Sequence, residues 1–152
     1  MSEDDSLIHR YGSSNLFFGK NAGNFTMSGA NDNVGFGEDA LSSLTSGDSN
    51  MAIGIGALEN LTSAGSNFAL GNYAMNTLQT GNANTAIGTY ALFTGNTAVR
   101  NVAIGLSSGY YNSSGGRNVF IGALAGANPD GVGANGNTTG TIKADLGYKT
   151  YP

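Results

Sequence analysis

Few residues in this 152-residue chain belong to the types that carry out chemistry. His9 is the only histidine and lies in a polar leader, where a lone side chain has no partner for acid–base work. The acidic residues Glu38, Asp39, Asp48 and Glu59 fall among turn-forming residues. A pair of carboxylates could cleave a glycosidic bond, but solvation at corners accounts for these four. We therefore expect no catalytic residue and no enzyme activity.

Metal and cofactor sites are equally poorly supported. The chain has no cysteine, which excludes disulfides and thiolate metal sites. Asn128, Asp130, Asn135 and Asn137 offer oxygen ligands, but a calcium loop normally needs more carboxylates and a bidentate glutamate. A flexible loop is the simpler interpretation. We expect no metal.

Other binding patterns are also incomplete. The triplets GFG and GIG (35–37 and 54–56) look like parts of a dinucleotide loop, yet they repeat along the chain and open no helix. Threonine rows that would suggest ice binding are missing, because the column that would carry them holds a single threonine, Thr85. We expect no cofactor.

Composition narrows the class of protein. Charged residues make up only 11% and the net charge is −4, with scattered cations, so nucleic-acid binding is not expected. Apolar residues make up 39% and are regularly placed, which favours an ordered chain despite 25 glycines. The N-terminal MSEDDSLIHR does not read as a secretory signal, and no apolar stretch is long enough to insert into a membrane.

An asparagine opens a short apolar-plus-glycine unit seven times. The first step is eighteen residues and every later one is seventeen, which is typical of a stacked-coil architecture. The units read NLFFG, NVGFG, NMAIG, NFALG, NTAIG, NVAIG and NVFIG. The seven openings are Asn15, Asn33, Asn50, Asn67, Asn84, Asn101 and Asn118. Stacked coils would superpose these residues in a ladder of side-chain amides, or each asparagine could simply tolerate a left-handed turn; the two are compatible.

Each unit alternates between large and small residues when its asparagine is numbered position zero. Positions one and three are large, as in Thr85 and Ile87, whereas positions two and four are alanine or glycine, as in Ala86 and Gly88. Side chains alternate along a strand, so these pairs of positions share opposite faces. We expect the large face inside the coil. The small face, which includes Ala69, would then be an outer surface for close packing between chains.

A second apolar piece at positions seven and eight, such as Ala57–Leu58, is followed by turn-forming clusters. This order predicts a strand, a corner, a shorter strand and a second corner in each repeat. The fold class is therefore all-β, a parallel β-solenoid of about seven coils. Because so small a coil has a thin core, we infer a homo-oligomer of cyclic symmetry. A ring of three is its simplest form, although the number three does not follow from the physics.

The units NMAIGIGALENLTSAGS and NTAIGTYALFTGNTAVR resemble the head repeats of YadA-type trimeric autotransporter adhesins. They are still closer to the seventeen-residue variant in phage tail-fibre proteins. The resemblance covers roughly Asn15 to Gly126. It implies a left-handed parallel β-roll and a homotrimer.

Three segments follow from the repeat boundaries. Residues 1–14 form a polar N-terminal leader, either disordered or docked to a larger particle; residues 15–126 form the repeat solenoid; residues 127–152 form a C-terminal loop and a cap or tip. The sides of the rod repeat one chemistry, so recognition is expected at the tip, where Tyr148 and Tyr151 are candidate receptor contacts. Phe17 and Phe120 break the small-residue rule in the first and last units, and we interpret them as caps of the stack.

Two functions compete. The first is a non-enzymatic structural virion protein: a short trimeric phage fibre, a spike or a capsid decoration protein, located on the virion. It would attach to a larger particle through its leader and contact a host-surface glycan or protein. The alternative is the head fragment of a bacterial trimeric surface adhesin, located on the bacterial cell surface. The repeat supports both, and the N-terminus favours the first.

Overall fold

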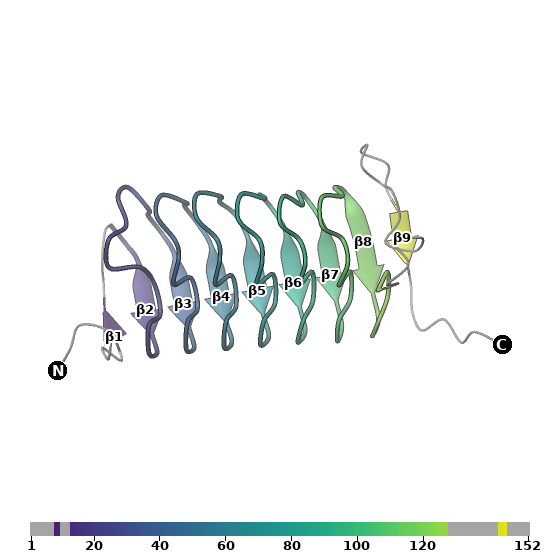
Figure 1. Cartoon of the computed structure of the whole chain (residues 1–152), viewed down its shortest axis with the longest axis horizontal. Helices are drawn as coiled ribbons and strands as arrows, with labels where there is room; N and C mark the ends of the chain where they lie inside the picture. The colour runs from purple at the N-terminus through teal and green to yellow at the C-terminus, as the bar shows by residue number, and fades with distance from the viewer. Residues whose placement is uncertain (1–7, 10–12, 128–142, 146–152) are drawn as a thin grey trace.

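The computed structural model is a rod of parallel coils (Figure 1). It describes residues 8–9, 13–127 and 143–145. Seven parallel strands mark the seven units and are joined by about six complete turns. These strands are β2 (Leu16–Phe18), β3 (Val34–Phe36), β4 (Met51–Ile53), β5 (Phe68–Leu70), β6 (Thr85–Ile87), β7 (Val102–Ile104) and β8 (Asn118–Ile121). The all-β solenoid predicted from the repeat is confirmed.

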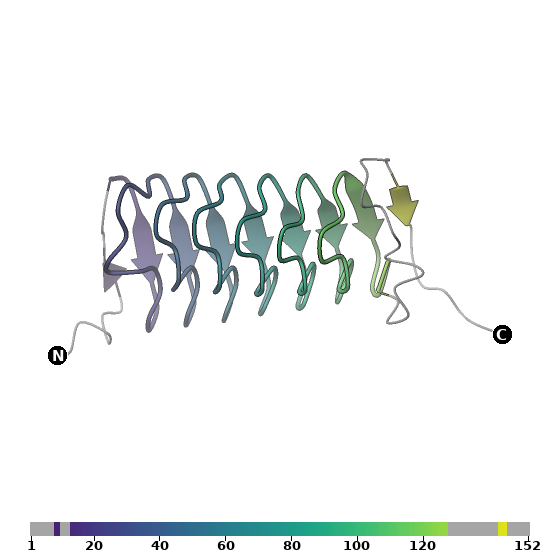
Figure 2. The same ribbon diagram turned by 45° about the horizontal axis from the view of Figure 1, so that its top comes forward.

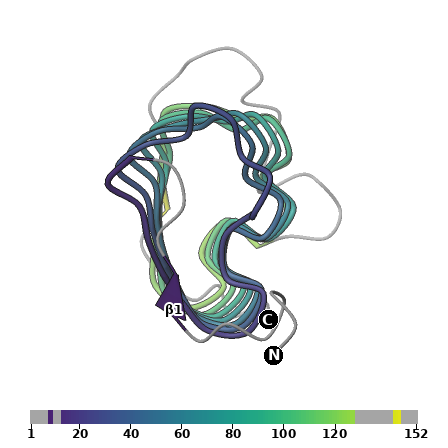
Figure 3. The same ribbon diagram turned by 90° about the vertical axis from the view of Figure 1, so that its left-hand side faces the viewer.

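The strict repeat length sets the register of the sheet. Each strand pairs with its equivalent in the next coil, so that Thr85 lies beside Val102 and Ile87 beside Ile104. All the parallel strands consequently lie side by side in one sheet (Figure 2). Viewed along the rod, successive coils follow nearly the same path with a small progressive shift, so equivalent repeat positions form columns along the rod (Figure 3).

Short strands pair with both ends of the sheet. β1 (Ile8–His9) pairs antiparallel with β2, and β9 (Lys143–Asp145) pairs parallel with β8. Backbone groups at a sheet edge would otherwise be open to pairing with another chain. Parts of the N-terminal leader and of the C-terminal segment therefore extend the solenoid sheet.

The prediction that positions one and three lie inside the coil is wrong. Ala52, Ala69, Ala86 and Ala103 at position two are completely buried, while the large residues on either side of them point outward. The alternation of large and small residues shows that each strand has two different faces. Because both faces are apolar or small, the alternation does not show which of them points into the coil. From β3 to β7, the residue at this interior position is glycine or alanine.

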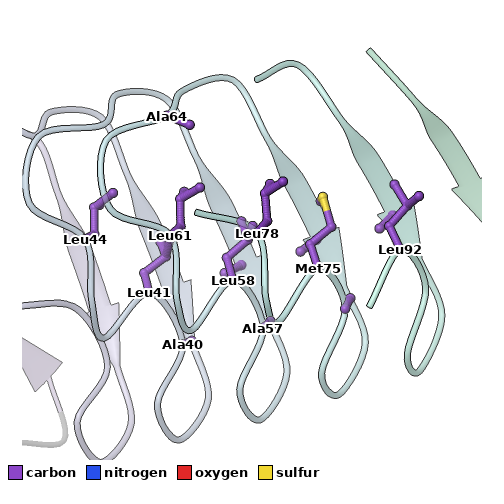
Figure 4. Packing of buried hydrophobic residues seen from close by; sticks show 14 of the residues in the cluster. Ala40, Leu41, Leu44, Ala57, Leu58, Leu61, Ala64, Met75, Leu78 and Leu92 are labelled. Atoms are coloured by element: carbon purple, nitrogen blue, oxygen red, sulfur yellow. The ribbon is translucent and has the colours of Figure 1, made fainter. Parts of the chain in front are cut away.

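Leucines from the return segments fill the rest of the interior (Figure 4). One buried column lies at position eight, with Leu41, Leu58, Met75 and Leu92. A second lies at position eleven, with Leu44, Leu61 and Leu78. The predicted shorter strand at positions seven and eight is absent from the described residues: Ala57 and Leu58 lie in a turn, and Leu58 has a positive φ of 51°.

Phe17 and Phe120 occupy the interior of the first and last coils and are completely buried. Position eight is glycine beside both rings, instead of leucine. A Cβ on Gly23 would lie 2.5 Å from the Phe17 ring, and one on Gly109 would lie 2.8 Å from the Phe120 ring. The large and small residues have exchanged places, so core volume is conserved at both ends.

The glycine at position four is required by the stacking of the coils. Gly71 has a φ of +138°, and a Cβ there would lie 2.6 Å from the carbonyl group of Gly88 in the next coil. The same close approach recurs from Gly19 to Gly105. Because the obstructing atoms are backbone, a side chain could be accommodated only by separating the coils.

We therefore expect Gly71→Ala to destabilise the rod severely. The unfavourable φ alone costs about 1–3 kcal/mol, and the clash with Gly88 adds to it. Gly29→Ala is the matched control, because Gly29 also has a positive φ of 88° but no atom within 4 Å of the added Cβ. Urea unfolding should show a much lower midpoint for Gly71→Ala than for Gly29→Ala. Equal midpoints would contradict the close stacking.

Candidate interaction surfaces

The seven asparagines at position zero form one buried column. In its central part, the Nδ2 of Asn84 donates to Asn67 Oδ1 at 3.1 Å and to the Ala98 carbonyl oxygen at 2.8 Å. The Oδ1 of Asn84 in turn accepts from the backbone N and the Nδ2 of Asn101, at 3.0 and 3.1 Å. From Asn33 to Asn101, each side chain thus bonds to the asparagines of both neighbouring coils and to a carbonyl of its own coil.

A left-handed conformation at these asparagines does not explain the column. The positive φ occurs one residue earlier, as in Ala83 (58°) and Arg100 (56°), and at none of the seven asparagines. Residue types as different as alanine and arginine occupy that turn position. The asparagines are needed for their amides, which makes the column structural rather than a binding site.

We expect Asn84→Ala to destabilise the rod without changing its surface. The substitution leaves the Ala98 carbonyl and the Asn101 amide without their partners inside the coil, and each such group costs about 1–3 kcal/mol. Asn96→Ala, at an exposed turn position, should be close to neutral. Thermal unfolding followed by circular dichroism measures both. A stability loss below that of Asn96→Ala would show that the column contributes nothing.

The acidic residues considered for catalysis each have a different interaction partner. Asp39 accepts from Asn21, Asp48 from the backbone and side chain of Asn31, and Glu59 from Asn76. Glu38 lies 3.7 Å from the Lys20 ammonium group. The described part of the chain holds no cluster of three metal-binding side chains. Nor does it contain a helix that could cross a membrane.

The outer face of the sheet is a continuous apolar surface, which we call the strand face. It consists of the side chains at positions one and three of β2 to β8. Phe36 is 51% exposed, Ile121 is 42% exposed, and the rings of Phe18 and Phe36 stack at 4.7 Å. Thr85 is the only polar residue in these two columns. Single exposed apolar residues are ordinary on protein surfaces, but a contiguous apolar stripe marks an interaction site.

A second apolar surface, the aromatic strip, lies on the turns and return segments that follow β5, β6 and β7. It comprises Tyr73, Tyr90, Phe93, Tyr110 and Tyr111. The rings of Tyr73 and Tyr90 stack at 5.4 Å, those of Phe93 and Tyr110 at 5.0 Å, and Tyr90 contacts the edge of Phe93 at 5.5 Å. Tyr111 extends the cluster through an edge contact with Tyr110 at 4.7 Å.

Some predicted sites cannot be placed. Tyr148 and Tyr151, the candidate receptor contacts, and the candidate calcium loop at 128–137 lie outside the described residues. The backbone of His9 is placed in β1.

Comparison with protein-family models, curated proteins and solved structures found no match for this chain. The likeness to YadA-type head repeats therefore rests on the repeat motif alone.

Proposed function

We propose that this protein is a rigid, non-enzymatic structural module that works as a homotrimer held together by the strand face. The observation that carries the proposal is the row of exposed or half-buried apolar side chains at position three of seven consecutive strands. The coil interior does not explain this row, because its members point away from the core.

The spacing of the row favours copies of the same chain as the covering partner. Side chains on the strand face recur at the coil spacing of about 4.8 Å. A surface that matches such a row along its full length must have the same period, and another copy of this rod has it. An assembly with closed symmetry would cover the strand face on every copy. The resemblance to YadA-type repeats suggests that the assembly has three copies and that the coil is left-handed.

We further propose that the trimer is a virion component: a short fibre, a spike or a capsid decoration protein. Support comes from the likeness to the phage tail-fibre variant of the repeat and from the close stacking of the coils, which makes the rod rigid. The N-terminal leader would join the particle, and the end with Tyr148 and Tyr151 would face a host-surface glycan or protein. The alternative, a bacterial adhesin head on the cell surface, shares the same repeat.

Antibodies against the folded rod separate these two locations. Immunogold electron microscopy of purified phage particles and of bacteria carrying the gene should label the particles. Labelling of the bacterial surface alone would favour the adhesin head. In a particle that incorporates the protein, deletion of residues 1–7 should abolish incorporation and leave the trimer intact, since the deletion spares β1. Normal incorporation of that variant would refute the docking role of the leader.

A further inference from the structure

We propose that the aromatic strip is a binding surface for a neutral oligosaccharide on the side of the rod. The inference extends the proposed attachment function and rests on it for the biological setting. It differs from the expectation that recognition is confined to the tip, because the strip is a local, non-repeated feature of the rod's side.

The fold itself does not require rings at these positions. Tyr73 and Tyr90 occupy position six, and Phe93 and Tyr110 occupy position nine. Equivalent positions in the other coils hold small, polar or aliphatic residues: Asn21, Asp39, Gly56, Ser107 and Leu124 at position six, and Asn24, Ser42, Glu59, Asn76 and Ala127 at position nine. Tyr73, Tyr90 and Tyr111 remain 36%, 37% and 42% exposed, an unfavourable contact with water that a ligand would relieve.

The side chains around the strip are mostly uncharged, and several are polar, although Leu106 is apolar and exposed. Asn72 and Thr89 precede the two stacked tyrosines, and Ser107 follows in the same column. At positions five to ten of the coils that begin with β4 to β7, the only charged residue is Glu59, whose carboxylate accepts from Asn76 at 2.8 Å. A sugar ring has an apolar face of C–H groups and an edge of hydroxyl groups. Aromatic rings that carry a phenol, flanked by amides and hydroxyls, match both. The absence of a cation here disfavours sulfated or sialylated glycans.

Each of the two ring stacks is followed by a smaller side chain in the next coil. Tyr73 and Tyr90 are nearly parallel, with 8° between their planes, so this stack runs along the rod. The next residue in the Tyr90 column is Ser107, and the next in the Tyr110 column is Ala127. The apolar face of a pyranose chair could stack on the exposed side of such a ring. The strip spans three coils, so it suits a short stretch of two or three sugar units.

The test uses the full-length wild-type protein and an array of immobilised neutral, sialylated and sulfated oligosaccharides. The informative variant is Tyr90→Ser with Tyr110→Asn, which introduces residues that the same columns already contain. The matched control is Asn96→Ala, at an exposed turn position outside the aromatic strip. We expect the wild type and the control to bind a neutral oligosaccharide, and the strip variant to bind at least tenfold more weakly.

Several results would overturn the inference. These are a wild type that binds no neutral glycan, a strip variant that binds normally, and binding only to a proline-rich peptide offered in parallel. Sedimentation of the strip variant could also overturn the inference. If that variant dissociates the proposed oligomer, the rings belong to a subunit interface. None of these outcomes depends on whether the protein is incorporated into a particle. Failure of the glycan site can therefore be distinguished from failure of the proposed function.

Discussion

Ala86→Leu is expected to unfold the solenoid, even though it only adds apolar atoms to a strand. Ala86 is completely buried at position two, where the coil interior is occupied by the leucine columns. Extra methylene groups in such a core typically cost about 1–3 kcal/mol and more where the backbone cannot move. The paired sheet on both sides restricts that movement here. Urea unfolding monitored by circular dichroism should show a large drop in stability for this variant.

The ends of the rod supply a control for this prediction. Phe17 is accommodated at position two because position eight of its coil is Gly23. A double variant, Ala86→Phe with Leu92→Gly, should therefore be more stable than Ala86→Phe alone. A double-mutant cycle measures this coupling. Additive losses would mean that positions two and eight do not share one space in the core.

Ile87→Asp is expected to dissociate the proposed homotrimer and leave the coil folded. The side chain is half-buried on the outer face of β6, so the charge remains hydrated in a single rod. In the assembly the same carboxylate would be buried among apolar groups without a partner, which is strongly unfavourable. Size-exclusion chromatography should show a smaller species whose far-ultraviolet circular dichroism still indicates β-structure.

Asn96→Asp provides the matched control, since it adds the same charge at an exposed turn. That variant should elute with the wild type. If Ile87→Asp unfolds the chain as Ala86→Leu does, the two residues do not face opposite sides of the strand. An Ile87→Asp variant that elutes with the wild type would instead mean that this face is not an interface.

The strands and their stacking could be predicted because the seventeen-residue step repeats without interruption from Asn33 to Asn118. Which face of each strand points into the coil could not be predicted. Ala86 and Ile87 are both apolar, and alternation between two apolar faces does not distinguish the interior from the exterior. The leucine column at position eleven was missed because it runs through only three coils, after which Gly95 and Asn112 replace Leu78.

The aromatic strip was hidden for a different reason. Tyr73, Tyr90 and Phe93 occupy two repeat positions three residues apart, and the pattern covers only some of the coils. Contacts between tyrosines in different turns cannot be inferred until it is known how the coils align with one another. The asparagine column, in contrast, could be anticipated because the same residue recurs at the same position in all seven units.

The central claim is that the strand face, with Phe36 and Ile121 exposed on a single rod, is covered by copies of the same chain. Sedimentation equilibrium of the wild-type protein over a range of concentrations tests it most directly. We expect a single species of about 46 kDa, three times the 15.4 kDa chain. A stable 15.4 kDa monomer at every concentration would contradict it.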